Sequence, residues 1–257
     1  MNIQSIENLA TKHKSLSQGV IDYEKYAYYA ITHHSTAIEG STLTETQVVD
    51  LLEYGKTAKN KPFEHHQMVF DHYQALQFVV TEAQKKRELS TEFIKEIAQK
   101  TMNSTGGFVQ TVLGTYNIAK GDFRLSAVRA GNRTFPDYKK VPDLVETLCK
   151  ITNDALKSHL QSSFEAKCKI AFQLHFEFVS IHPFGDGNGR TSRLLMNYVQ
   201  SYFDLPLSIV YKQDRLKYID ALEKARNIEN LEPFFDFMFR QYQKNLKAEI
   251  KGMEKTM

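Results

Sequence analysis

Glycine and proline are scarce in this chain, and their distribution leaves long stretches without a helix-breaking residue. The 257 residues include twelve glycines and six prolines, and most of the glycines fall within 106–131 and 185–189. Because these two residue types are the strongest local breakers of regular structure, the unbroken stretches favour helices. We expect helices over ten segments: 5–17, 20–39, 44–54, 64–86, 90–102, 141–159, 163–181, 188–203, 214–227 and 231–252.

One of these segments also fits a β-strand. Every second position in it is apolar, which is typical of a buried strand: Ile170, Phe172, Leu174, Phe176 and Phe178. Against a strand, the apolar character continues from Cys168 to Ile181, which is longer than most strands, and both faces are apolar. Periodicity alone therefore leaves helix and strand about equally favoured here.

The segment that follows gathers residues suited to binding an anion. It reads Ile181-His182-Pro183-Phe184-Gly185-Asp186-Gly187-Asn188-Gly189-Arg190-Thr191-Ser192-Arg193. Glycine permits positive φ, so this backbone can turn its N–H groups inward at the start of the next helix, where an anion is favoured. A phosphate there would repel Asp186 unless a divalent cation lay between them, which points to a metal–nucleotide complex.

The charged side chains of this loop have candidate roles. Pro183 disfavours an α conformation at His182, so the preceding segment should end there and leave the imidazole at the mouth of the loop. With an unperturbed pKa of about 6.5, that imidazole can take a proton from a hydroxyl at neutral pH. Arg190 and Arg193 share one helix face, and guanidinium groups suit bidentate contact with phosphate oxygens. The loop matches neither a P-loop nor a dinucleotide-binding fingerprint.

Residues 182–193 resemble the signature of the Fic family, His-x-Phe-x-Asp/Glu-Gly-Asn-Gly-Arg-x-x-Arg, at every fixed position. The resemblance implies an enzyme that moves AMP from Mg-ATP onto a protein hydroxyl, with His182 as general base and Asp186 as metal ligand. It implies that Phe184 is buried and anchors the loop. It also assigns a run of residues to the nucleotide: Gly187, Asn188, Gly189, Arg190, Thr191, Ser192 and Arg193.

A second motif lies far upstream, at Ser35-Thr36-Ala37-Ile38-Glu39-Gly40. Gly40 fits a helix C-cap, so Glu39 should project near the end of a helix with Ser35 one turn back on the same face. On its own, a glutamate before such a glycine is ordinary. The six residues also resemble the Ser/Thr-x-x-x-Glu-Gly/Asn inhibitory motif of many Fic proteins. The resemblance implies that Glu39 pairs with Arg193 and occupies the place of the γ-phosphate, as in self-inhibited class II members.

Together the two motifs lead us to expect a self-inhibited protein adenylyltransferase. Its cofactors would be ATP and Mg²⁺, and its partner would be a target protein with an acceptor Ser, Thr or Tyr hydroxyl. Some class II relatives also remove AMP, and the residues do not separate a Glu39 that only blocks from one that also positions water. Two alternatives stay open: Fic-type transfer of another group (UMP, phosphocholine or phosphate), and an ATP-binding regulatory module with negligible transfer.

Two further regions are assigned by the resemblance. Segment 121–138 is typical of a short β-hairpin with Gly-Asn at its tip. It corresponds to the Fic flap, which aligns the target segment, unless it is a surface hairpin without a role. Its nucleotide-side residues would be Ala130, Gly131, Asn132 and Arg133. Relatives often carry a tyrosine pair beside the adenine, where this chain has Tyr218-Ile219. Tyr218 is therefore expected at the adenine, and the base preference stays open.

The fold implied by the resemblance is all-α. It is the Fic fold, a helical bundle with a central buried helix, an anion-binding loop and a small β-hairpin flap. No linker or repeat divides the chain, so we expect one domain over 1–257. Its parts would be an inhibitory helix (about 20–40), a Fic core (about 64–203) with the flap (about 121–138), and C-terminal helices (about 205–252).

Composition fits a cytoplasmic globular enzyme. Hydrophobic residues make up 42% of the chain, yet no window approaches the roughly 18–20 apolar residues of a membrane span, and no secretory signal is visible. Cys149 and Cys168 lack CxxC spacing, which favours buried reduced thiols. A net charge of +3 with dispersed basic residues predicts neither a nucleic-acid nor a membrane partner. Because Fic relatives are often dimers, a homodimer is left open.

Overall fold

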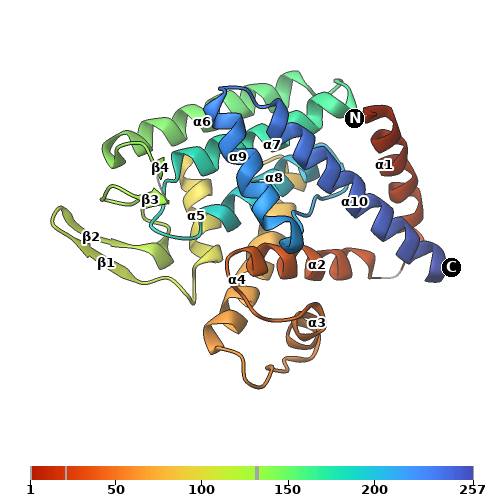
Figure 1. Ribbon diagram of the computed structural model, residues 1–257, viewed down its shortest axis with the longest axis horizontal. Coiled ribbons are helices and arrows are strands. Elements are labelled where there is room, and N and C mark those ends of the chain that lie inside the picture. The colour runs from red at the N-terminus through yellow and green to blue at the C-terminus, as the bar shows by residue number, and fades with distance from the viewer. Residues whose placement is uncertain (1, 21, 131–132, 257) are drawn as a thin grey trace.

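The computed structural model describes residues 2–20, 22–130 and 133–256, and these ranges are mostly helical (Figure 1). Each of the ten expected segments holds one helix, so the all-α prediction is confirmed. The helices are α1 (Ile3–Ser17), α2 (Tyr23–Ile38), α3 (Glu45–Tyr54), α4 (Phe63–Gln84), α5 (Thr91–Thr101), α6 (Val141–Ser158), α7 (Phe164–Ile181), α8 (Asn188–Tyr202), α9 (Arg215–Asn227) and α10 (Glu232–Thr256).

Local sequence explains several helix ends. Thr44 begins α3 with a capping box, in which its hydroxyl accepts from the N–H of Gln47 and its own N–H donates to the Gln47 side chain. Ser90 and Ser163 cap α5 and α7 with their hydroxyl oxygens. At the end of α2, Gly40 adopts a φ of 107°, a conformation that side chains rarely permit. The helix therefore stops where the sequence predicts.

Helix α7 lies at the centre of the bundle between α6 and α8 (Figure 1). It is continuous from Phe164 to Ile181, so the strand alternative for this segment is wrong. A helix surrounded by other helices is apolar on most sides. Apolar residues at every second position therefore do not distinguish such a helix from a strand. Cys149 in α6 and Cys168 in α7 are both buried and free, as predicted.

Two antiparallel hairpins lie between α5 and α6, and both project from one end of the helical body (Figure 1). The second, β3 (Arg129–Ala130) with β4 (Arg133–Thr134), is the hairpin that the sequence predicts. Its expected tip, residues 131 and 132, falls outside the described residues. The first, β1 (Phe108–Thr111) with β2 (Gly114–Asn117), was not predicted. Gly114 permits its turn with a φ of 130°.

The arrangement brings three distant parts of the chain to one place. Helix α8 packs against α4, α5 and α7, and α2 packs against α4 and the start of the α9 region. The loop between α7 and α8 consequently lies beside the end of α2. The terminal helices α1 and α10 pack together at the other end of the molecule (Figure 1). Within the described ranges, no helix combines the length and apolar character needed to cross a lipid bilayer.

Candidate active site

His182 lies at the junction between α7 and the glycine-rich loop. It is the C-cap of α7, with φ 55° and ψ 59°, and its backbone N–H donates to the carbonyl of Phe178 at 3.0 Å. This left-handed conformation is uncommon for a residue with a side chain. It turns the chain away from the helix axis just before Pro183. The sequence expectation that the helix stops at His182 matches this geometry.

The surroundings of His182 keep its imidazole uncharged. Burial lowers the pKa of the ring to about 4, and although the nearby carbonyl of Val179 opposes the shift, the charges of Arg124 and Arg133 add to it. The ring is therefore neutral at pH 7. A neutral imidazole is the form that can accept a proton from a hydroxyl group.

Arg124 ties the hairpin segment to the backbone of His182. Its guanidinium is 1% exposed and donates to the carbonyls of His182 at 2.8 Å, Ser126 at 2.7 Å and Pro136 at 2.6 Å. The planar fork of five N–H donors can serve three carbonyls at once. This residue fixes both ends of the predicted flap, and sequence reasoning did not identify it.

One flap residue stacks on the imidazole, and a second lies over that residue. The ring of Phe135 lies 4.0 Å from that of His182, centroid to centroid, with an interplanar angle of 22°. The guanidinium carbon of Arg133 lies 4.5 Å from the centroid of the Phe135 ring, and its Nη2 donates to the carbonyl of Ser180 at 3.3 Å. The flap thus contacts the candidate base directly. Of the other flap residues assigned to the nucleotide, Ala130 lies in β3, and Gly131 and Asn132 lie outside the described residues.

The loop after His182 is closed by its own side chains. Phe184 is 1% exposed, and its ring packs against those of Phe123 and Phe178. The side chain of Asn188 donates to the carbonyl of Phe184 at 2.9 Å and accepts from its N–H at 3.0 Å. In this conformation the Asn188 amide holds the loop together, and its contact with a phosphate stays a prediction.

Small residues are required where the loop meets α8. Gly187 adopts a φ of 79°, and a Cβ there would lie 2.8 Å from Sδ of Met102. Helix α8 starts at the next residue, and its first backbone bond to this loop runs from the N–H of Thr191 to the carbonyl of Gly187 at 2.9 Å. The N–H groups before it have no acceptor within the helix, which is the usual arrangement of an anion site.

Glu39 and Ser35 both reach Arg193, which lies 3% exposed in α8. Glu39 Oε1 is 2.7 Å from Nη2 of Arg193, whose Nε donates to the Ser35 hydroxyl at 2.9 Å and whose Nη2 donates to the Ser35 carbonyl at 2.9 Å. Burial acts to raise the pKa of Glu39, but the charge and hydrogen bond of Arg193 outweigh it, so the pKa is lowered. The carboxylate is therefore ionised at neutral pH.

Arg190 and Asp186 form the other charged part of the site. Arg190 is 1% exposed, and its Nη2 lies 2.8 Å from Sδ of Met102 and 3.7 Å from Oδ2 of Asp186. The Asp186 side chain is 67% exposed at the mouth of the loop. The two arginines and this carboxylate thus surround the start of α8.

The donor set fits a polyphosphate with a bound cation. Among the described residues, Nε of Arg190 and Nη1 of Arg193 are buried without a hydrogen-bond partner, which is costly for a charged group. Phosphate oxygens would supply the missing acceptors. The described residues contain no cluster of three acidic, histidine or cysteine ligands. Mg²⁺ commonly binds one or two carboxylates together with substrate phosphates, so Asp186 alone can be its protein ligand.

Three other residues assigned to the nucleotide are buried in this structure. Thr191 and Ser192 are both 0% exposed, and the Ser192 hydroxyl donates to the carbonyl of Gly189 at 2.8 Å. Tyr218 is 4% exposed, with its hydroxyl 2.7 Å from Nε2 of His175. The hydroxyls of Ser192 and Tyr218 have structural partners here, whereas that of Thr191 is buried without one among the described residues. The contact of all three with a nucleotide stays a prediction.

Two residues near the arginines carried no sequence signal. His72 in α4 is completely buried, and burial followed by the charges of Arg193 and Arg190 holds its pKa well below the usual value. Arg215 donates from Nε to the carbonyl of Ile38 at 2.9 Å and so caps the end of α2. Both lie near the arginines because elements far apart in sequence pack together, which local patterns do not reveal.

Comparison with known proteins agrees with this geometry. Residues 88–200 match the family model described as the Fic/DOC family. A protein from Drosophila willistoni named "Protein adenylyltransferase Fic" is 32% identical over 215 residues, which is 84% of this chain and 40% of that protein. The chain therefore spans less than half the length of the curated relatives it matches.

Solved structures share the fold over nearly the whole chain. A Fic domain containing signaling protein from Bacteroides thetaiotaomicron has a TM-score of 0.79 at 25% identity, covering 97% of both chains. Fic-1 from C. elegans has a TM-score of 0.80 at 23% identity, covering 99% of this chain and 72% of that one. The chain therefore has the Fic fold, and its residues 88–200 form a domain of the Fic/DOC family.

Proposed function

We propose that this chain is a protein adenylyltransferase, which transfers AMP from Mg-ATP to a hydroxyl group of a target protein. The observation that carries the proposal is the loop after α7. It sets a neutral imidazole, His182, beside the start of a helix that carries two buried arginines and one exposed carboxylate. The name of the curated relatives, "Protein adenylyltransferase Fic", supports the same reaction.

In the proposed reaction, His182 takes the proton of the acceptor hydroxyl. The hydroxyl oxygen forms a bond to the α-phosphorus as the bond from that phosphorus to the pyrophosphate oxygen breaks. Arg190, Arg193 and the first N–H groups of α8 bind the phosphates and the negative charge that the leaving group develops. Mg²⁺ held by Asp186 would neutralise part of that charge. The flap, fixed by Arg124, would align the target segment with the imidazole.

We further propose that Glu39 inhibits this reaction by occupying Arg193. The 2.7 Å contact places a carboxylate oxygen where a phosphate oxygen would bind the same guanidinium. A charge-assisted hydrogen bond of this kind contributes roughly 1.5–3 kcal/mol. At about 1.4 kcal/mol per factor of ten, it would suppress transfer by about ten- to a hundredfold rather than abolish it.

Removal of AMP is the second candidate activity. The side chain of Glu39 is 33% exposed and lies beside the loop, and its pKa is lowered. An ionised carboxylate in that place could orient a water molecule and accept its proton. Incubating AMP-modified protein with wild type and Glu39→Gln tests this activity, because only the wild type should release AMP.

The main experiment measures transfer from labelled nucleotides to the protein itself and to added proteins. Wild type, Glu39→Gly and Glu39→Gly/His182→Ala are each incubated with Mg²⁺ and ATP, UTP, CDP-choline or GTP. We expect Glu39→Gly to incorporate AMP about ten- to a hundredfold faster than wild type, and the double variant to be inactive. The intact mass of Glu39→Gly should increase by one AMP.

A matched control and two contrary outcomes complete the design. Glu229→Gly removes an exposed glutamate that follows α9 and should behave as wild type. If Glu39→Gly and wild type incorporate label equally fast, the inhibitory role of Glu39 is wrong. If the folded Glu39→Gly protein transfers no label from any nucleotide, the chain is a binding module and not a transferase.

A further inference from the structure

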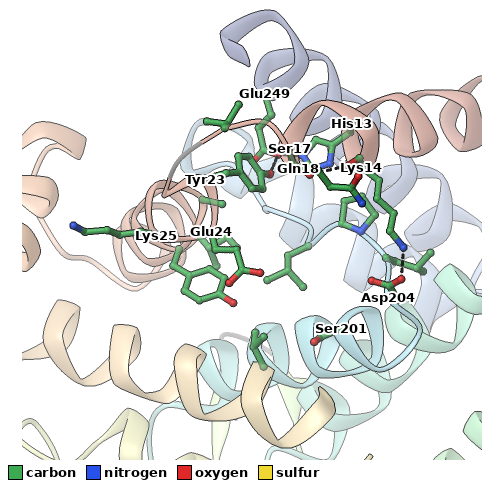
Figure 2. Close-up of a pocket in the computed structure, with 18 of the residues that line it drawn as sticks. His13, Lys14, Ser17, Gln18, Tyr23, Glu24, Lys25, Ser201, Asp204 and Glu249 are labelled. Atoms are coloured by element: carbon green, nitrogen blue, oxygen red, sulfur yellow. Dashed lines mark hydrogen bonds and ion pairs between the residues drawn. The ribbon is translucent and has the colours of Figure 1, made fainter. Parts of the chain in front are cut away.

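We propose that an open pocket between α1, the first turns of α2, α10 and the segment that follows α8 binds a small organic cation with an apolar body. The pocket, shown in Figure 2, has a volume of about 610 Å³. It is lined by the first turns of α2, whereas Glu39 lies at the other end of that helix. Pockets of roughly 300–1,000 Å³ are typical of small-molecule sites. The proposal is independent of the transfer reaction.

A buried polar cluster holds the walls of this pocket in place. Nε2 of His13 in α1 lies 2.6 Å from the hydroxyl of Tyr23 in α2 and 2.5 Å from Oε2 of Glu249 in α10. The Tyr23 hydroxyl donates to the same carboxylate oxygen at 2.5 Å. Three helices from distant parts of the chain are thereby joined through Nε2 of His13, while Nδ1 of the same ring is buried without a partner among the described residues. The pocket is consequently formed without a ligand.

The lysines that line the pocket already have partners. Lys14 pairs with Asp204 on the far wall, as the dashed line in Figure 2 shows. Lys25 pairs with Glu53 of α3 at 2.5 Å, and its side chain points away from the pocket (Figure 2). Among the described residues of the lining, both lysines are thus paired with carboxylates, and the pocket does not suit a phosphate or another anion.

Two carboxylates of the lining remain without a partner. Neither Asp22 nor Glu24 forms a side-chain hydrogen bond or ion pair with the residues that the structure describes, and Glu24 points into the pocket (Figure 2). Burial raises the pKa of the Tyr28 hydroxyl and the charge of Glu24 adds to the shift, while for Tyr23 the pKa is raised by burial, then by Glu249, and less by Glu24. An ammonium or guanidinium group is the complement of an unpaired carboxylate, and aromatic rings in the same lining also attract a cation.

The rest of the lining is largely apolar and would cover a hydrocarbon body. It includes Ala27, Tyr28, Ile31, Val80, Leu205 and Leu207. Because apolar surface is favourable to bury, a ligand with a hydrocarbon part beside its charge would bind better than a bare cation. The chemical class is therefore an amine or guanidine with an aryl or alkyl chain.

The proposal is tested by calorimetric titration of the full chain with phenethylamine and hexylamine, and with 2-phenylethanol as the uncharged analogue. We expect saturable binding of both amines with dissociation constants below about 1 mM, and binding of the alcohol at least about tenfold weaker. Glu24→Gln should weaken amine binding by about tenfold. Ala27→Phe fills the pocket and should remove binding of all three compounds.

A control separates ligand binding from the ordinary role of an acidic residue in a first helical turn, where it stabilises the helix. Glu64 is an exposed glutamate in the first turn of α4, and Glu64→Gln should bind the amines as wild type does. Circular dichroism checks that each variant is folded. The proposal is overturned if wild type binds neither amine saturably, or if binding is unchanged in both Glu24→Gln and Ala27→Phe.

Discussion

A Cβ on Gly189 would lie 2.2 Å from Oε1 of Glu39. The same oxygen is 2.7 Å from Nη2 of Arg193, so the carboxylate reaches the guanidinium across the space that the glycine leaves open. Gly189 therefore permits the contact between α2 and α8 as well as belonging to the anion-binding loop. The two motifs of the sequence are physically joined at this residue.

Gly189→Ala should have opposite effects on stability in two backgrounds. In wild type the added methyl must displace Glu39 from Arg193, so we expect a lower free energy of unfolding. In Glu39→Gly the methyl meets no carboxylate, and the higher helix propensity of alanine should stabilise the protein by up to about 1 kcal/mol. Urea unfolding of the four proteins measures the coupling, and additive effects would contradict the contact.

The stability of the protein should fall as the pH drops below about 6.5. Burial lowers the pKa values of His33 and His182 to about 4 and those of His34 and His175 to about 3, and His72 is lowered as well. A group with a lowered pKa binds fewer protons in the folded state than in the unfolded state. Its stabilising contribution is present above the unfolded pKa and is lost as the pH falls towards the folded one.

His72→Leu isolates one of these contributions. Both ring nitrogens of His72 lack a hydrogen-bond partner among the described residues, so leucine removes a titrating group without breaking a bond. Between pH 7 and pH 5 this variant should lose about 2 kcal/mol less of its free energy of unfolding than wild type does. Urea unfolding at both pH values measures this. The partly buried His159, changed to Gln, is the control, and equal losses in both variants would refute the assignment.

Arg124→Lys should loosen the flap. An ammonium group cannot serve the three carbonyls that the guanidinium bonds, so at least one of them would lose its partner, costing about 1–3 kcal/mol. Hydrogen exchange of residues 124–136 should accelerate, and transfer by the Glu39→Gly protein should decrease. Arg129→Lys, at an exposed position of β3, is the matched control. Unchanged exchange in Arg124→Lys would show that the clamp is not needed.

The two cysteines should be unreactive in the folded protein. Burial raises the pKa of Cys149 to about 12 and that of Cys168 well above its usual value. The thiolate is the reactive form, so Ellman's reagent at pH 8 should label neither residue until the protein is unfolded in guanidinium chloride. Rapid labelling of two thiols in the native protein would contradict their burial.

Much of the fold could be predicted because the ends of its helices are set by residues at those ends. Pro183 and Gly40 end α7 and α2 through their own backbone preferences, and the scarcity of glycine elsewhere leaves helices as the remaining choice. Helix α7 was ambiguous because burial on most sides removes the periodic polar face on which such predictions depend. The β1–β2 hairpin was missed, since Val112 and Leu113 at its turn are exposed apolar residues and carry no pattern of burial.

The candidate site also contains residues that a local motif predicts and residues that only the folded structure reveals. His182, Asp186 and the two arginines lie in one continuous motif, and their residue types alone suggest a phosphate site. Arg124 contacts a carbonyl 58 positions away, and Phe135 stacks on a ring that a different element supplies. Such contacts depend on how the flap packs against α7, and no local pattern encodes them.

Glu39, at the end of α2, lies on the same chain as Arg193, 154 positions away. An inhibitor on a separate molecule is lost on dilution, whereas a tethered group keeps a fixed effective concentration at its site. The proposed inhibition would therefore be intramolecular, and the inhibited fraction would not depend on the protein concentration. Its relief would require a motion of the end of α2 within each molecule.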